Sequence, residues 1–359
     1  MARSKTFFLT FLLMTGLSGC ASIGPRTIVR DRFDYITAIS DSWKSQTLLN
    51  LVKIRYGDAP VFLDVDSAIN QYSVDSSFSL SGMWLINPFE EHNAAQSLSA
   101  LGGYSDKPTI TYTPLSGEKF ARNLMAPIPP AAILNLLQAG YPADVVLRAC
   151  VHAINGIHSR YGGGARARPA DAEFYRLIEK LRKLQLSGEI GMRTKKTDDH
   201  TATLFVFRHN PSPEIEADSA EVRRMLGLDP AARELSIVYG SVAAHDKEIA
   251  LLTRSMLEIL IDLSSHIQVP TASVEERRTY ASPPPDTANG APVAPLIQIF
   301  SSPKPPPDAF TAVPYRQGWY WIDDKDFPSK SFFSFIMFLF TLTETEGTQK
   351  APVITLPAG

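Results

Sequence analysis

Proline sets the strongest limit on how this chain can fold. Eleven prolines fall within the 45 residues from Pro270 to Pro314, including two triplets at 283–285 and 305–307. Proline has no amide hydrogen to donate and fixes φ, so this stretch excludes a continuous helix or an inner strand. The apolar residues of Thr271–Ala294 are too few to offset the entropy of ordering them. We therefore expect a proline-rich mobile loop here.

This loop divides the sequence into regions. We expect a signal peptide at residues 1–19, a tether at 20–30 and an α+β body at 31–268. The loop occupies 269–295, and strands and a helix at 296–359 are expected to complete the same core. At 44% hydrophobic residues, the 359-residue chain can bury a large core.

Hydrophobic periodicity predicts the elements of the body. Apolar residues recur at helical spacing in five segments, which are 31–56, 130–155, 170–186, 245–268 and 331–342. Alternating or β-branched runs predict strands at 61–65, 71–84, 109–113, 188–193, 203–208, 234–239, 296–300 and 319–322. The order of these elements predicts an α+β fold with a mixed, mainly antiparallel sheet covered by helices.

The last helix is the most hydrophobic part of the chain after its N-terminus. Phe332 to Leu342 is about 11 residues long, roughly half of what a membrane-spanning helix needs, and acidic residues follow it. We expect a buried helix in which Phe335 and Phe338 fill the core.

The N-terminus has the features of an export signal. Two basic residues precede the apolar run Phe7–Met14, which is too short to span a bilayer. The following Leu17-Ser18-Gly19-Cys20 resembles the lipobox of bacterial lipoproteins cleaved by signal peptidase II. This resemblance implies that Cys20 becomes a lipidated N-terminus that anchors the protein in a membrane. Ala21-Ser22 after the cysteine implies the outer membrane, on a side that the sequence does not fix.

Charge and cysteine content limit the partners. With 35 Lys+Arg against 37 Asp+Glu, nothing favours nucleic acid as a ligand. Once Cys20 is lipidated, Cys150 is the one cysteine left, so no intramolecular disulfide can form. Its apolar surroundings predict a small buried core residue rather than a nucleophile.

One short motif suggests catalysis. Ser116-Gly117-Glu118-Lys119 matches the S-x-x-K pattern of penicillin-recognising serine enzymes, in which the lysine activates the serine. The companion S-D-N and K-T-G motifs are missing, so the other interpretation is a helix start capped by Ser116. Neither a cofactor nor a metal is predicted, because the seven histidines lie scattered without ligand spacing.

An arginine loop is the other candidate site. Arg160, Arg166 and Arg168 surround the run Gly162-Gly163-Gly164. Guanidinium groups and backbone amides in a glycine-rich loop can hold phosphate or carboxylate. The alternative is a soluble connector between helices.

These features favour a non-catalytic, lipid-anchored envelope protein that docks a protein partner or scaffolds an assembly. The alternative is a periplasmic serine acyltransferase or hydrolase acting on the cell wall through Ser116 and Lys119. The body also resembles proteobacterial lipoproteins of unassigned function in its I-P-P and W-x-D-D segments, here 128–130 and 321–324. That resemblance implies no activity.

Overall fold

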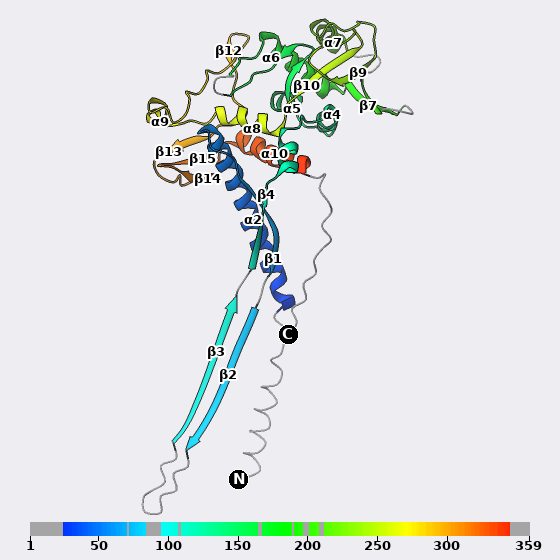
Figure 1. The fold of residues 1–359 in the computed structure, drawn as a ribbon. Helices are drawn as coiled ribbons and strands as arrows, with labels where there is room; N and C mark the ends of the chain where they lie inside the picture. Colours follow the sequence, from blue (N-terminus) through cyan, green and yellow to red (C-terminus); the bar gives the residue numbers. More distant parts are fainter. Residues whose placement is uncertain are drawn as a thin grey trace, which may run out of the picture. The chain divides into compact units, whose positions relative to one another are not determined.

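The computed structural model describes residues 24–69, 72–83, 95–106, 109–163, 167–188, 190–196, 201–207 and 212–344. It divides into two compact units, each described separately below. Unit 1 comprises Met1–Ser42 and Leu63–Pro114, and unit 2 comprises Trp43–Phe62 and Leu115–Gly359. The combination of helices and mostly antiparallel sheets confirms the α+β prediction (Figure 1).

Unit 1 contains paired strands and the first half of a long helix. Strands β2 (Tyr72–Met83) and β3 (Ala95–Asp106) are antiparallel and stay in register over twelve pairs. Strands β1 (Phe62–Ile69) and β4 (Thr109–Leu115) form a separate two-stranded sheet. The predicted strands 61–65, 71–84 and 109–113 exist, but the prediction of one large sheet is wrong for them. Strand β3 escaped prediction because its serines and paired glycines have low strand propensity.

Helix α2 (Gly24–Arg55) begins seven residues before the predicted helix 31–56, so the second half of the expected tether is helical. Its predicted apolar stripe divides between the units. In unit 1 Phe33 is 66% exposed and Ile36 53%, whereas Leu48 and Leu51 in unit 2 are fully buried. The hydrophobic periodicity is the same in both halves of α2, although only the half in unit 2 contributes to a hydrophobic core.

A six-stranded sheet is the centre of unit 2, and its strand order is β6-β5-β10-β9-β8-β7. The strands are β5 (Val151–Ile154), β6 (Ile157–His158), β7 (Ile190–Lys196), β8 (Thr201–Phe207), β9 (Glu234–Tyr239) and β10 (Glu248–Thr253). Strand β10 runs parallel to β9, and the other described pairs are antiparallel. The sheet is therefore mixed and mainly antiparallel, as predicted.

The predicted helix 245–268 is wrong in its first half. Strand β10 occupies Glu248–Thr253, and the helix α8 covers only Met256–Ser265. The apolar run of β10 lies between β9 and β5, which satisfy its backbone groups on both sides. A capping box marks the true helix start, because Ser255 accepts from the Glu258 amide and Glu258 accepts from the Ser255 amide.

The predicted helix pair at 130–155 is shorter than expected. Helices α4 (Pro130–Gln138) and α5 (Ala143–Cys150) form, but Val151–Ile154 leaves the helix as strand β5. Its β-branched residues pair with β10, and Gly156, at φ +82°, turns the chain into β6. The Cys150 side chain is fully buried, and burial raises its thiol pKa to about 12, which confirms a core role.

Helices pack against this sheet. Helix α4 contacts β7 and β9, and α6 (Ala172–Ser187) contacts β6 and β7. Helices α3 (Glu118–Met125) and α7 (Pro213–Met225) also belong to this region. Helix α6 confirms the predicted helix at 170–186 with a small change of boundary.

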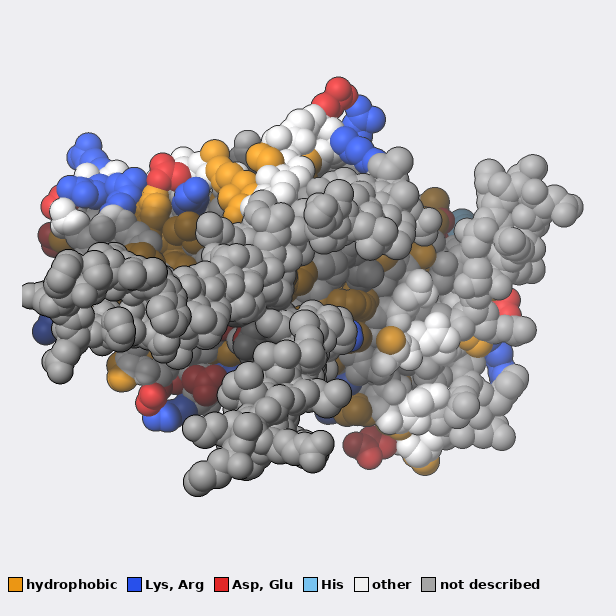
Figure 2. Space-filling model, turned by 90° about the horizontal axis from the view of Figure 1, so that it is seen from below, with side chains coloured by type: hydrophobic (Ala, Val, Ile, Leu, Met, Phe, Trp, Pro, Cys, Tyr) orange, Lys and Arg blue, Asp and Glu red, His pale blue; other side chains and the backbone are white. Residues whose placement is uncertain are grey.

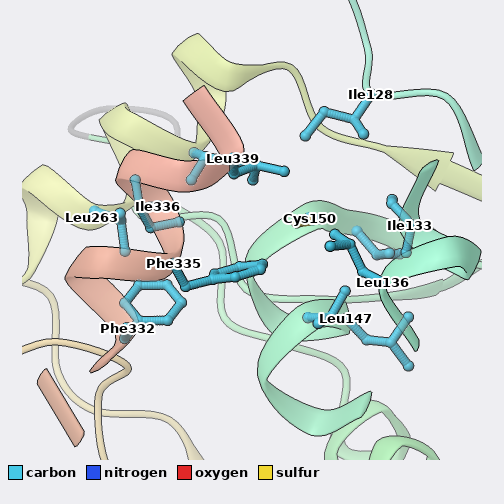
Figure 3. Close-up of a cluster of buried hydrophobic side chains, with 14 of the residues drawn as sticks. Ile128, Ile133, Leu136, Leu147, Cys150, Leu263, Phe332, Phe335, Ile336 and Leu339 are labelled. Atoms are coloured by element: carbon cyan, nitrogen blue, oxygen red, sulfur yellow. The ribbon is translucent and has the colours of Figure 1, made fainter. Parts of the chain in front are cut away.

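The C-terminal region forms a second sheet and a buried helix. The sheet order is β13-β15-β14, made of β13 (Phe300–Ser302), β14 (Ala309–Tyr315) and β15 (Gly318–Asp323). Helix α10 (Phe327–Glu344) directs Phe332, Phe335, Ile336 and Leu339 at α4, α5 and α8 (Figure 3). These residues belong to the same hydrophobic cluster as the six-stranded sheet.

Two expectations about α10 have opposite outcomes. Phe335 is buried at 7% exposure, whereas Phe338 is 46% exposed and does not fill the core. The two side chains are three positions apart, which places Phe338 at the edge of the buried face. Among the described residues, no helix is both long and apolar enough to cross a membrane.

The proline-rich segment contains short regular elements and is hydrogen-bonded to the rest of unit 2, although none of residues 271–294 is buried. It contains α9 (Thr271–Glu275) and the two-residue strands β11 (Thr287–Ala288) and β12 (Ala291–Pro292). The buried guanidinium of Arg55 donates to Tyr280 O and Ser282 Oγ, both at 2.9 Å, and stacks on the Tyr280 ring. Thr279 Oγ1 donates to Arg55 O. Side chains from distant parts of the chain satisfy polar groups that the prolines leave without ladder partners.

Candidate functional site

The predicted lipidation residue, Cys20, lies outside the described residues, and so does Arg166 of the arginine loop. The remaining candidates, Ser116, Lys119, Arg160 and Arg168, can be placed.

Ser116 and Lys119 do not adopt the geometry expected of an S-x-x-K enzyme. Helix α3 begins at Glu118, so Ser116 precedes the helix and does not open it. The N-cap residue of α3 is Gly117, at φ +93°, and no side chain makes a capping hydrogen bond there. The capping role predicted for Ser116 is therefore also wrong. Both side chains are exposed. Neither contributes to the two cavities described below.

The arginine loop closes through its backbone. Tyr161 and Arg168 exchange amide-to-carbonyl hydrogen bonds at 2.9 and 2.7 Å. The Arg168 guanidinium donates to Asp171 Oδ1 at 2.9 Å on the surface. Arg160 instead donates to Pro284 O at 3.4 Å. Both arginines line a cavity of about 360 Å³ beside residues 283–287, and Arg160 also lines a neighbouring, smaller cavity.

This smaller cavity, here called the arginine cavity, has a volume of about 170 Å³. It lies between α5, α6, α8 and the proline-rich segment. The side chains that give it its chemistry are Arg148, Ser159, Arg160, Tyr175, Asp262, Ser265, His266 and Asp286. Its outer wall includes the exposed Pro285, Ala294 and Pro295, so it reaches the surface.

A buried ion pair fixes the inner wall of this cavity. Arg254 Nη1 lies 3.0 Å from Asp262 Oδ2, with side chains 1% and 7% exposed. Arg254 also donates to Ser159 Oγ at 2.7 Å and to the Arg160 carbonyl, and Asp262 Oδ1 accepts from the Gly162 amide at 2.6 Å. These bonds hold the start of the arginine loop against α8.

The short distance between the arginine loop and α8 explains why residue 162 is a glycine. A Cβ atom at position 162 would lie 2.2 Å from Ser265 Oγ and 2.7 Å from Asp262 Oδ1. Gly162 therefore allows the backbone of the loop to contact α8. The sequence had instead suggested that this glycine makes the loop flexible for anion binding.

Arg148 and Tyr175 form the opposite wall. Arg148 Nη2 donates to Ala294 O at 2.7 Å, and its guanidinium lies 5.8 Å from the Tyr175 ring centre. Tyr175 Oη donates to Asp286 Oδ2 at 2.6 Å. Burial and this hydrogen bond raise the pKa of Tyr175, so it stays a neutral donor. Together these bonds attach both ends of the β11–β12 hairpin to α5 and α6.

The cavity carries an excess of positive charge. Arg254 balances Asp262, which leaves the guanidinium groups of Arg148 and Arg160 against the single carboxylate of Asp286. Burial lowers the pKa of His266 to about 4, so this ring is neutral at neutral pH.

Arg160 Nη2 is buried without a hydrogen-bond partner. A buried donor left unpaired is costly, and a carboxylate or phosphate oxygen would satisfy it. Within the described part of the chain, no group of three or more His, Cys, Asp or Glu residues is placed to hold a metal ion.

Sequence reasoning found Arg160 but missed its neighbours Arg148, Tyr175, His266 and Asp286. They come from three helical segments and the proline-rich segment, up to 138 positions apart in the chain. The signal available was a charged or polar residue next to an apolar helix face, as in Leu147-Arg148 and Phe174-Tyr175. Comparison with known families, curated proteins and solved structures finds no match to this chain.

Proposed function

We propose that this protein is a lipid-anchored component of the bacterial envelope that docks a partner protein through the arginine cavity. The observation that carries the docking role is the buried, unpartnered Arg160 Nη2 in a cavity with excess positive charge. The lipobox at Leu17–Cys20 supports the anchor, and Ala21-Ser22 favours the outer membrane.

The size of the cavity limits what it receives. A volume of about 170 Å³ accommodates one side chain or terminus, not a folded element. Arg148 and Arg160 favour a carboxylate there, because a guanidinium presents several N–H donors to paired oxygens. We therefore assign the partner as an envelope protein that inserts one acidic side chain, with further contacts around the exposed rim.

Hydrophobic side chains that are exposed elsewhere on the protein also favour a role in an assembly. On the face drawn in Figure 2, hydrophobic side chains of described residues reach the surface between charged ones. Large exposed side chains include Phe33, Ile36, Ile110, Tyr112 and Leu186. Burying apolar side chains such as these against a partner would contribute favourable free energy to an assembly.

Site-specific photo-crosslinking in cells tests the docking proposal. A benzophenone amino acid replaces Ala294, which is exposed at the rim and contributes only its carbonyl to Arg148. We expect a crosslink to an acidic segment of one envelope protein, identified by mass spectrometry. Arg160→Ala should remove the crosslink.

Arg168→Ala is the matched control, because Arg168 belongs to the same loop but pairs with Asp171. It should retain the crosslink. Equal crosslinking in wild type and Arg160→Ala contradicts the proposal. Equal loss in both variants would assign binding to the loop as a whole, and the cavity would then not be the docking site.

A further inference from the structure

Unit 2 contains another, chemically different cavity of about 360 Å³, here called the apolar cavity. It lies between the six-stranded sheet and helices α4 to α7. Its sheet side comprises Ile154, Gly191, Phe205, Ile237, Ile249 and Leu251, and its helix side is mostly leucine. None of its described lining residues also lines the arginine cavity.

The cavity has a closed end and an open end. Leu147, Leu251 and Val222 are at most 3% exposed and form its floor. Gln138, Gly140, Leu186 and Gly191 are exposed and form its mouth. A depression that runs from solvent into a floor made only of hydrocarbon suits a long, narrow apolar ligand.

Hydrogen bonds of the Gln185 side chain fix the positions of the helices around the mouth. Gln185 Nε2 donates to Leu137 O and Tyr141 O, both at 2.8 Å, and its Oε1 accepts from the Ala143 amide at 3.0 Å. These bonds join the end of α6 to the connection between α4 and α5. The spacing of the helices around the mouth is therefore set by the fold itself.

Among the described lining residues of this cavity, Arg182 is the one with a charged side chain. Arg182 Nη1 donates to Gln185 Oε1 at 2.6 Å, which directs the guanidinium along the mouth. Its Nε lies 3.7 Å from Asp144 Oδ1, a long and half-exposed ion pair. A cation at the entrance to an apolar space matches an amphiphile with an anionic head.

We propose that the apolar cavity binds the hydrocarbon chain of a single-chain carboxylate amphiphile, with its carboxylate at Arg182. An apolar cavity of about 150 Å³ accommodates benzene. By that scale, the 360 Å³ here accommodates a chain on the order of a dozen carbon atoms. The ligand is a free fatty acid, whose chain fills the cavity and whose carboxylate pairs with Arg182.

Photoaffinity labelling of the full-length protein in lipid nanodiscs tests the proposal. The probes are dodecanoate bearing a diazirine near its methyl end, its methyl ester, and the lysophosphatidylcholine that carries the same chain. We expect dodecanoate to label peptides from the cavity floor, mapped by mass spectrometry. Labelling confined to other peptides overturns the proposal.

Variants that fill the cavity give the decisive comparison. Ile237→Trp fills it from the half-buried middle of β9, and Val238→Trp adds the same bulk to the opposite face of that strand. Gly191→Leu narrows the mouth, and no atom lies within 4 Å of the added Cβ, so this variant should fold normally. Ile237→Trp and Gly191→Leu should lose floor labelling, and Val238→Trp should keep it. Unchanged labelling in Gly191→Leu contradicts the proposal.

The variant Arg182→Gln distinguishes binding of the carboxylate from binding of the hydrocarbon chain. It should weaken labelling by dodecanoate about tenfold and leave the methyl ester unchanged, because only a carboxylate gains a charge-assisted bond. Equal loss for both probes would contradict the role of Arg182. Labelling by the lysophosphatidylcholine as strong as that by dodecanoate would contradict the proposal, because its acyl chain is esterified and carries no carboxylate. Arg160→Ala should not alter any of these results, which separates this proposal from the docking proposal.

Discussion

At the scale of single residues, burial decides the role of each charged group. Arg254 and Asp262 are both nearly inaccessible and form a pair at 3.0 Å, whereas Arg168 and Asp171 form a pair of similar length on the surface. A surface pair contributes little to stability, because solvent screens it. A buried pair matters mainly when one partner is lost, because the other charge then has no compensation.

We therefore expect Arg254→Met to lower the free energy of unfolding by about 3 to 5 kcal/mol. The double variant Arg254→Met/Asp262→Leu should recover most of that loss, because no unpaired charge remains. Urea denaturation followed by tryptophan fluorescence measures both. A double variant as unstable as the single one would show that the hydrogen bonds to Ser159 and Gly162, not the uncompensated charge, dominate.

Cys20 carries the prediction about anchoring. Cys20→Ser should abolish both signal-peptide processing and membrane retention, since serine cannot form the thioether on which cleavage depends. Immunoblots of cell fractions and labelling with an alkyne fatty acid report the two effects. A Cys20→Ser protein that matures and stays with the membranes is incompatible with a lipoprotein. Density-gradient separation of the wild-type protein should place it in the outer membrane.

At the scale of elements, helix α10 shows how the buried face of one helix is delimited. Phe335 contacts the Tyr141 ring at a centroid distance of 5.3 Å and the Phe332 ring at 6.1 Å. Phe335→Ala should cost about 3 to 5 kcal/mol of stability. Phe338→Ala, on the exposed edge of the same helix, should cost less than about 1 kcal/mol. Thermal and urea denaturation compare them, and equal losses would show that Phe338 is covered.

The proline-rich segment makes a second prediction at this scale. Because Arg55, Tyr175 and Arg148 bind its backbone or side chains, limited proteolysis should leave residues 271–294 intact in the folded protein. Arg55→Met removes two hydrogen bonds and the stacking on Tyr280, and should make the segment cleavable. Arg278→Met, on the exposed side of the same segment, is the control. Rapid cleavage of the wild-type protein would support the loop that proline content alone suggested.

At the scale of the whole molecule, His266 couples stability to pH. Burial lowers its pKa from 6.5 to about 4, so the unfolded chain takes up a proton in this interval before the folded protein does. Stability should therefore fall as pH decreases from about 6.5 to 4. Because the ring keeps some exposed surface, we expect a loss of about 2 kcal/mol. His266→Gln should flatten this part of the profile, and the exposed His245→Gln should not.

The sequence by itself determined what local patterns encode. Apolar spacing identified α4, α6 and α10, alternation identified β9, and the apolar neighbours of Cys150 identified a core residue. These features can be read from the local sequence, because the apolar residues of each pattern lie on one side of their own helix or strand. The sequence also located Arg160, because three arginines around glycines are visible without a fold.

Only the tertiary structure decided which distant segments meet. The run Ile249–Leu252 is a strand because β9 and β5 lie on either side of it, although its apolar spacing also suits a helix. The segment 270–295 is attached to the rest of unit 2, although five of its six prolines are exposed, because Arg55, Tyr175 and Arg148 supply hydrogen bonds and contacts that the segment lacks by itself. The arginine and apolar cavities exist only between elements far apart in the chain. Local propensity cannot encode such pairings, because the free energy that selects them comes from surfaces buried between segments rather than within them.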